Sequence, residues 1–127
     1  MDFELRFSRW FVPLATPLGM GPRRSVVRID TASHSMVVEM GWAFKARIPL
    51  SSLVSVGRGR PAWSGWGVHG WGGSWLVNGA SHGIVALTID PPAQARAVGF
   101  PVRLRHLRVS VTEPVALISV LNHVQAA

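Results

Sequence analysis

The sequence predicts a mainly β fold: a small antiparallel β-barrel or two orthogonal sheets of seven to eight strands, with one C-terminal α-helix. Short segments with alternating apolar and polar residues follow one another, separated by turns rich in glycine and proline. Only the last segment has apolar residues at helical spacing. With 127 residues and 48% hydrophobic content, the chain suffices for one domain with a packed core, spanning 1–127 with strands over about 3–111.

The N-terminal residues alternate in the manner of a half-buried strand. Phe3, Leu5 and Phe7 lie on one side of the segment 3–11, with polar residues between them. The prolines of the following segment, 12–22, cannot donate a ladder hydrogen bond. We therefore expect a strand followed by a loop.

A hairpin is predicted around the four-residue loop Thr31–His34. Pairing Asp30 with Ser35 places Val27 beside Val38 on one face, so the hydrophobic pattern and the turn agree on the register. A further strand should follow over residues 42–48. Its inward residues are expected to be Trp42, Phe44, Ala46 and Ile48, and its outward residues Lys45 and Arg47.

The tryptophan-rich stretch 63–75 is expected to contain a tight hairpin. Glycines at 72 and 73 permit a two-residue turn with positive φ at both positions, so Trp71 would face Ser74. This register sends Trp66 and Trp75 to the core face. Trp63 and Trp71 remain open between a core role and exposed stacking.

The C-terminal third is expected to contain two strands and the helix. Residues 83–89 form an apolar strand, 90–101 a proline-rich excursion, and 102–111 a second strand. The apolar phase of the second strand shifts near Arg105 or His106, which indicates a bulge. Apolar residues at helical spacing after Pro114 then predict a helix over about 113–125.

Composition excludes several classes of function. The chain has no cysteine, which rules out disulfides and thiolate chemistry. The longest stretch without a charged residue or a histidine, 10–22, is interrupted by prolines and falls short of the roughly 20 apolar residues of a membrane-spanning helix. We expect a cytoplasmic protein, with the membrane surface as a candidate peripheral location.

Neither a catalytic site nor a cofactor site is predicted. Apart from Asp2 and Glu4, the few acidic residues are far apart in the sequence, and no acid and base dyad stands out. The five histidines lack the spacing of a zinc site. We therefore expect a protein that is not an enzyme and needs no metal or cofactor.

The net charge of +7 and the pI near 11.9 point to an anionic partner. Arginine provides all the basic residues except Lys45; it suits bidentate contact with phosphate, although a GC-rich genome would produce the same excess. A solvated surface is the alternative for each basic cluster. The candidates for binding an anion or a partner are Arg58, Arg60, Trp63, Trp71, Arg103, Arg105 and Arg108.

Several segments carry a family resemblance: "GMGPRRSVVRID", "IPLSSLVSV", "GWGVHGW" with "SWLVNG", "GIVALTID" and "LRVSVTEPVALISVL". Together with the order of elements they resemble bacterial pleckstrin-homology-like domains, and within that group a set of uncharacterised actinobacterial proteins. The likeness runs from about Arg6 to Leu121. It implies two roughly orthogonal sheets capped by a C-terminal helix. Lys45-Ala46-Arg47 has the basic-x-basic form of the lipid-binding branch but comes too late in the chain, so phosphoinositide specificity is not implied.

The leading functional hypothesis is a binding module that contacts an anionic or partly apolar partner, a membrane surface or a protein, through loops at one end of the barrel. A self-associating interaction domain is the first alternative, using a sheet edge or the outer aromatics Trp10 and Trp71. A single-stranded nucleic-acid binder is a weaker alternative, because basic and aromatic residues do not interleave along one strand. A barrel holding a small apolar ligand is the last.

Overall fold

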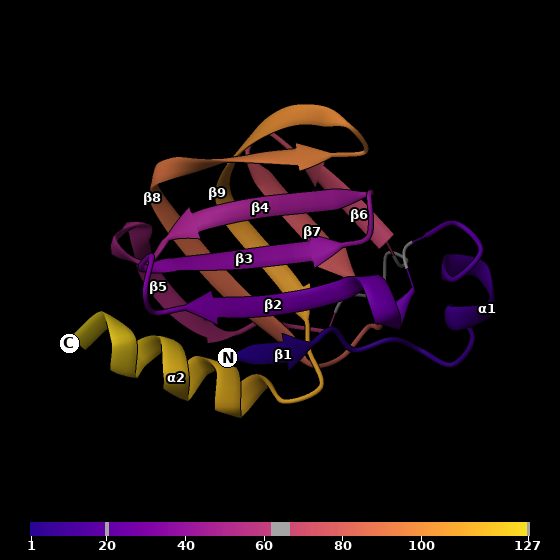
Figure 1. The fold of residues 1–127 in the computed structure, drawn as a ribbon, viewed down its shortest axis with the longest axis horizontal. Helices are drawn as coiled ribbons and strands as arrows, with labels where there is room; N and C mark the ends of the chain where they lie inside the picture. The colour runs from indigo at the N-terminus through magenta and orange to yellow at the C-terminus, as the bar shows by residue number, and fades with distance from the viewer. Residues whose placement is uncertain (20, 62–66, 127) are drawn as a thin grey trace.

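The structure is a computed structural model that describes residues 1–19, 21–61 and 67–126, with only the backbone described for residues 71, 125 and 126. Four strands at the N-terminal end pair in sequence order as an antiparallel meander. They form the front layer in Figure 1. Their bounds are β1 (Asp2–Glu4), β2 (Ser25–Asp30), β3 (Ser35–Met40) and β4 (Phe44–Pro49).

The remaining strands form a second layer that crosses behind the first (Figure 1). Their bounds are β5 (Leu53–Arg58), β6 (Gly67–Trp71), β7 (Ser74–Asn78), β8 (Ile84–Ala97) and β9 (Phe100–Ser110). The long strand β8 belongs to both layers: its first half pairs with β5 and its last residues, from Ala95 to Ala97, pair with β4. The pairing of β8 with β9 shifts register between Thr88 and Ala93, which is where β8 passes from one layer to the other.

The core lies between the two layers. Strand residues alternate between the core and solvent, as in β4, where Phe44, Ala46 and Ile48 are buried and the residues between them are exposed. Partners from β8 and β9, among them Leu87 and Leu107, fill the space from the other side. The single long helix, α2 (Pro114–Ala126), adds Leu117 and Leu121 to the same cluster, and both are fully buried.

Three short helical segments complete the described part of the fold. They are α1 (Val12–Ala15), η1 (Pro22–Arg24) and η2 (Leu50–Ser52). The N-terminal segment leaves β1 and bridges to the ends of two other strands, with Leu5 opposite Val111 and Phe7 opposite Gly79. The buried hydroxyl of Ser110 ties this crossing together, because it donates to the Arg6 carbonyl and accepts from the amide of Gly79.

Both predicted hairpins are confirmed in register. Asp30 pairs with Ser35 and Val27 with Val38, and Trp71 pairs with Ser74 around glycines 72 and 73, both of which have positive φ. The phase shift in β9 is also confirmed. Arg105 and His106 are both exposed between the buried Leu104 and Leu107, although the extra residues of the irregularity lie on β8.

Three local predictions are wrong. The N-terminal strand ends at Glu4 rather than continuing to residue 11. Residues 90–97 are not an excursion but the second half of β8, because the prolines occur where β8 changes layer and loses regular pairing with β9. Trp42 does not point inward: it precedes β4 in a turn and is 51% exposed.

The predicted mainly β fold with one C-terminal helix is confirmed, and its arrangement differs from the expected one in two respects. In the described residues the sheet has nine strands: eight form an open path that runs from β1 to β6, β5 branches off by pairing with β8, and the sheet does not close into a barrel. In addition, β7 pairs with β9 in parallel, whereas an antiparallel sheet was expected. Within the described ranges, no helix has the length and apolar character needed to cross a lipid bilayer.

Candidate binding surfaces

Three loops from distant parts of the sequence meet at one end of the molecule, on the right in Figure 1. We call this the loop end and define it as residues 8–19, 41–43 and 98–100. Hydrogen bonds join the three loops. The Trp42 indole N–H donates to the carbonyl of Leu18, and the amide of Val98 donates to the carbonyl of Ala43 at 2.7 Å.

Most of the large hydrophobic side chains that are exposed in the described ranges belong to the loop end. They are Trp10, Leu14, Leu18, Trp42, Val98 and Phe100, with exposed fractions between 47% for Val98 and 72% for Phe100. Scattered single apolar residues are normal on a protein surface, but a gathering on adjoining loops is typical of an interaction site. The loop end is therefore one candidate binding surface.

The apolar residues of the first loop form a stripe because its backbone is wound helically. Apart from the two prolines, the amides of residues 11 to 19 donate to carbonyls three or four residues earlier, so residues four positions apart lie on the same side. Trp10, Leu14 and Leu18 occupy the solvent side, whereas Phe11 and Ala15 are buried on the other side.

Basic residues border this stripe. The guanidinium of Arg9 lies 4.9 Å from the ring centroid of Trp10, and Arg23 and Arg24 are exposed just before β2. The Arg24 carbonyl accepts the Gly41 amide, which places η1 against the β3–β4 turn. Residues 5–29 contain no Asp or Glu, so the flank of the loop end is basic in both sequence and structure.

The backbone of the β8–β9 turn is unusual at Val98. Ala97 pairs with Phe100, leaving a two-residue turn in which Val98 has φ of 51° and Gly99 has φ of 83°. Positive φ is costly for a β-branched residue. Val98 thus combines a backbone conformation that is unfavourable for valine with a side chain that is 47% exposed. Neither property stabilises the turn.

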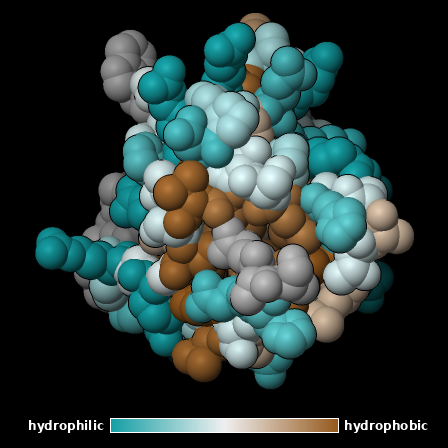
Figure 2. Space-filling view, turned by 90° about the vertical axis from the view of Figure 1, so that its left-hand side faces the viewer, coloured by the Kyte–Doolittle hydropathy of each residue, from teal (hydrophilic) through white to brown (hydrophobic). Residues whose placement is uncertain are grey.

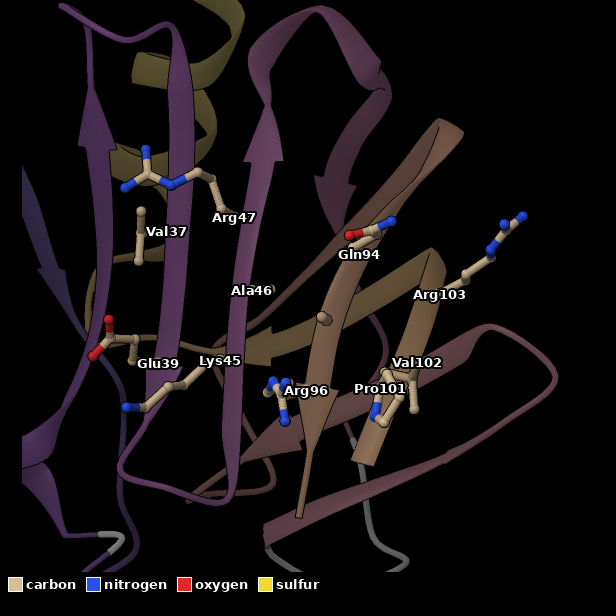
Figure 3. Close-up of a pocket in the computed structure, with 11 residues that line it drawn as sticks. Val37, Glu39, Lys45, Ala46, Arg47, Gln94, Arg96, Pro101, Val102 and Arg103 are labelled. Atoms are coloured by element: carbon tan, nitrogen blue, oxygen red, sulfur yellow. The ribbon is translucent and has the colours of Figure 1, made fainter. Parts of the chain in front are cut away.

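A second candidate surface is a groove of about 660 Å³ on the outer face of β3, β4, β8 and β9 (Figure 3). We call it the basic groove. It is lined by Val37, Glu39, Lys45, Ala46, Arg47, Gln94, Ala95, Arg96, Pro101, Val102 and Arg103. The strand registers explain the charged and polar part of this lining, because each strand sends every second residue to the outer face. Ala46 and Ala95, which lie between these residues, belong to the core.

Cations oppose one another across the strands of the basic groove. Lys45 pairs directly with Arg96, and the next outward residues along the same two strands are Arg47 and Gln94. Gln94 in turn pairs with Arg103. The single carboxylate of the lining, Glu39, pairs with Lys45 from the far side. In Figure 3, Lys45 and Arg47 lean toward β3 and Arg103 points outward, leaving the hollow between them.

The structure separates the residues that sequence reasoning placed in two basic clusters. Arg103 lines the basic groove. Arg108 pairs with Ala86 in the first half of β8, and Arg105 lies against the Gly73 turn, where a β-carbon on Gly73 would be 3.2 Å from its Cγ. Arg58, at the end of β5, pairs with Val85 of β8. Gln94, which is the partner of Arg103, lies nine positions further along β8.

The other predicted site residues are only partly described. Arg60 is exposed in the segment after β5. Trp63 lies outside the described residues, and for Trp71 only the backbone position in β6 is described. Sequence reasoning placed Lys45 and Arg47 on an outer face without assigning them to a site. It missed Arg96, because the segment that carries it was expected to be irregular.

The end opposite the loop end, where α2 and β5 lie, also has an apolar area. Figure 2 shows hydrophobic residues gathered near its centre with hydrophilic residues around them. Val54 in β5 and Val115 in α2 are exposed by 63% and 67%.

No described group of three or more His, Asp or Glu side chains is placed to hold a metal ion. Two carboxylates have shifted pKa values, and both lie outside the loop end and the basic groove. Hydrogen bonding to Arg28 lowers the pKa of Asp2, and hydrogen bonding to Ser33 lowers the pKa of Asp30. Comparison with family models, with curated proteins and with solved structures found no match for this chain. The two surfaces must therefore be interpreted from their own chemistry.

Proposed function

We propose that this protein is a non-enzymatic binding module that docks by its loop end onto an anionic membrane surface. The observation that supports this most directly is the combination of exposed apolar side chains from three adjoining loops with the arginines beside them. Tryptophan and leucine insert favourably at the boundary between headgroups and acyl chains. Each arginine near an anionic leaflet adds roughly 1 kcal/mol of attraction.

Two further features favour a membrane over a protein partner. Apart from Phe100, which begins β9 and is paired with Ala97, the apolar residues stand on turns and a short helical loop. They can therefore enter the interface without exposing unpaired strand groups. The basic flank has no Asp or Glu within residues 5–29, which suits a surface of uniform negative charge. A cytoplasmic, peripheral location is part of this proposal.

The test is co-sedimentation with vesicles of phosphatidylcholine alone and with phosphatidylserine added. We expect binding to the anionic vesicles that weakens with salt, because exposed charges are screened. The double variant Leu14→Ser with Leu18→Ser should reduce this binding about tenfold or more, since each exposed leucine that inserts contributes apolar burial. Val54→Ser with Val115→Ser, which removes two exposed apolar side chains from the opposite end, should bind like the wild type.

Two outcomes would contradict the proposal. Equal or absent binding to both kinds of vesicle would exclude an anionic membrane as the partner. Concentration-dependent dimerisation in light scattering, abolished by the Leu14 and Leu18 substitutions and insensitive to salt, would assign the loop end to self-association instead.

A further inference from the structure

The basic groove combines cations in a way that a sheet surface ordinarily avoids. Lys45 and Arg96 are directly opposed across β4 and β8, and like charges in this relation destabilise a sheet. Both side chains are exposed. In the described part of the chain, no carboxylate lies within ion-pair distance of Lys45 or Arg96. The ion pairs found there are made by Asp2.

Two of the three arginines of the groove are held by neutral oxygens that leave most of their donors available. Arg47 donates to the Ser35 hydroxyl at 2.9 Å, and Arg96 donates to the Gly99 carbonyl at 3.3 Å. A guanidinium has five N–H donors, so each arginine keeps donors for a ligand. These two bonds also orient the side chains from the rim of the groove.

The spacing of the cations fits more than one negative group. Opposed β-carbons lie about 5 Å apart, and residues two apart on a strand lie about 7 Å apart. Lys45, Arg96 and Arg47 therefore occupy three corners of a small rectangle, and Gln94, at the fourth corner, adds amide donors. Arginine and lysine together suit phosphate oxygens.

We infer that the basic groove is a binding site for a ligand that carries at least two adjacent phosphate groups, free in solution or on a lipid headgroup. The ligand takes the place of the missing counter-charge between β4 and β8. This site is distinct from the loop end, and its binding does not depend on membrane insertion. Glu39, the register partner of Lys45 on β3, marks the limit of the site toward β3.

The test is isothermal titration with pyrophosphate at low ionic strength. The double variant Lys45→Gln with Arg96→Gln should weaken binding about tenfold or more, because it removes two charge-assisted contacts. Arg58→Gln with Arg108→Gln removes the same charge from exposed positions outside the groove and should bind within about twofold of the wild type, which is the range of a weakly screened net-charge effect.

Thermal unfolding provides a second readout that does not depend on the titration. Without ligand, the groove variant should melt at or above the wild-type temperature, because it relieves the opposition of Lys45 and Arg96. Pyrophosphate should raise the melting temperature of the wild type and the control variant but not that of the groove variant. Absence of binding to the wild type, or equal loss in both double variants, would overturn the inference.

Vesicles distinguish the two sources of phosphate. If the ligand is a headgroup, vesicles with a phosphorylated phosphoinositide should bind more tightly than phosphatidylserine vesicles of equal charge, and the groove variant should lose this preference. If the ligand is soluble, both vesicles should bind alike. The Leu14 and Leu18 variant separates this inference from the proposed function, because it should bind phosphatidylserine vesicles more weakly and keep its affinity for pyrophosphate.

Discussion

Gly70 and Trp75 face each other across the β6–β7 hairpin, and the indole ring of Trp75 covers the glycine. A β-carbon at position 70 would collide with this ring. Gly70→Ala should therefore displace Trp75 from its place against the core and lower the free energy of unfolding by about 1–3 kcal/mol. Urea unfolding followed by tryptophan fluorescence measures the change.

Gly57 is the control for this substitution. It lies in β5 with nothing near the position of an added β-carbon and without positive φ. Gly57→Ala should leave the free energy of unfolding within about 0.5 kcal/mol of the wild type. Equal destabilisation by both substitutions would mean that loss of glycine, rather than the collision with Trp75, is responsible.

The ion pair between Asp2 and Arg28 gives the fold a defined dependence on pH. Nε and Nη2 of Arg28 donate to the two carboxylate oxygens of Asp2 at 2.9 and 3.2 Å, and this bonding lowers the pKa of Asp2. A lowered pKa means that the folded state holds the proton less tightly than the unfolded state. The pair therefore stabilises the fold above the ordinary carboxyl pKa of about 4, and its contribution is lost as the pH falls through the lower folded-state value.

Asp2→Asn tests this dependence. The substitution should lower the urea midpoint slightly at pH 7, because the pair is exposed and such pairs contribute little. The difference from the wild type should shrink as the pH falls below about 4. A difference that persists undiminished at the lowest accessible pH would assign the effect to something other than this carboxylate.

At the level of elements, the β8–β9 turn contains a residue, Val98, that lowers the stability of the fold but adds an exposed apolar side chain to the proposed binding surface. Its two positive φ values favour the Asn-Gly sequence of a primed turn over Val98 and Gly99. Val98→Asn should raise the free energy of unfolding by about 1 kcal/mol. It should also weaken binding to anionic vesicles, since it removes an exposed apolar side chain from the loop end.

Val54→Asn provides the comparison, because Val54 is an exposed valine within a strand. Here the substitution loses β propensity and should not stabilise the fold. Chemical unfolding and vesicle co-sedimentation of both variants separate the two effects. A Val98→Asn protein that is less stable than the wild type would contradict the conformational argument.

Local patterns predicted the elements whose partners lie nearby in the sequence. The hairpin around Thr31–His34 was fixed by the apolar alternation of its own strands, and the β6–β7 hairpin by two glycines. Prediction failed where a distant contact decides the structure. The prolines of β8 sit at its change of layer, which no local pattern reveals, and Trp42 turns outward because its N–H binds a carbonyl of the first loop.

At the scale of the whole molecule, both candidate surfaces are products of long-range pairing. Trp10, Trp42 and Phe100 come from segments far apart in the chain, and only the fold brings their loops to one end (Figure 1). Likewise, Lys45 and Arg96 become neighbours only through the pairing of β4 with β8. Net charge indicated an anionic partner, but it could not place that partner on the surface.

If the loop end docks onto a bilayer as proposed, the positions of the chain ends give the docked molecule a direction. In Figure 1 the N and C marks lie toward α2, on the far side from α1 and the β8–β9 turn. A fluorescent label joined to Ala126 would therefore be held away from a bilayer that receives the loop end, and it would transfer little energy to acceptor lipids. Anything fused there would be carried on the outward side of the docked protein, free to meet partners in the surrounding solution.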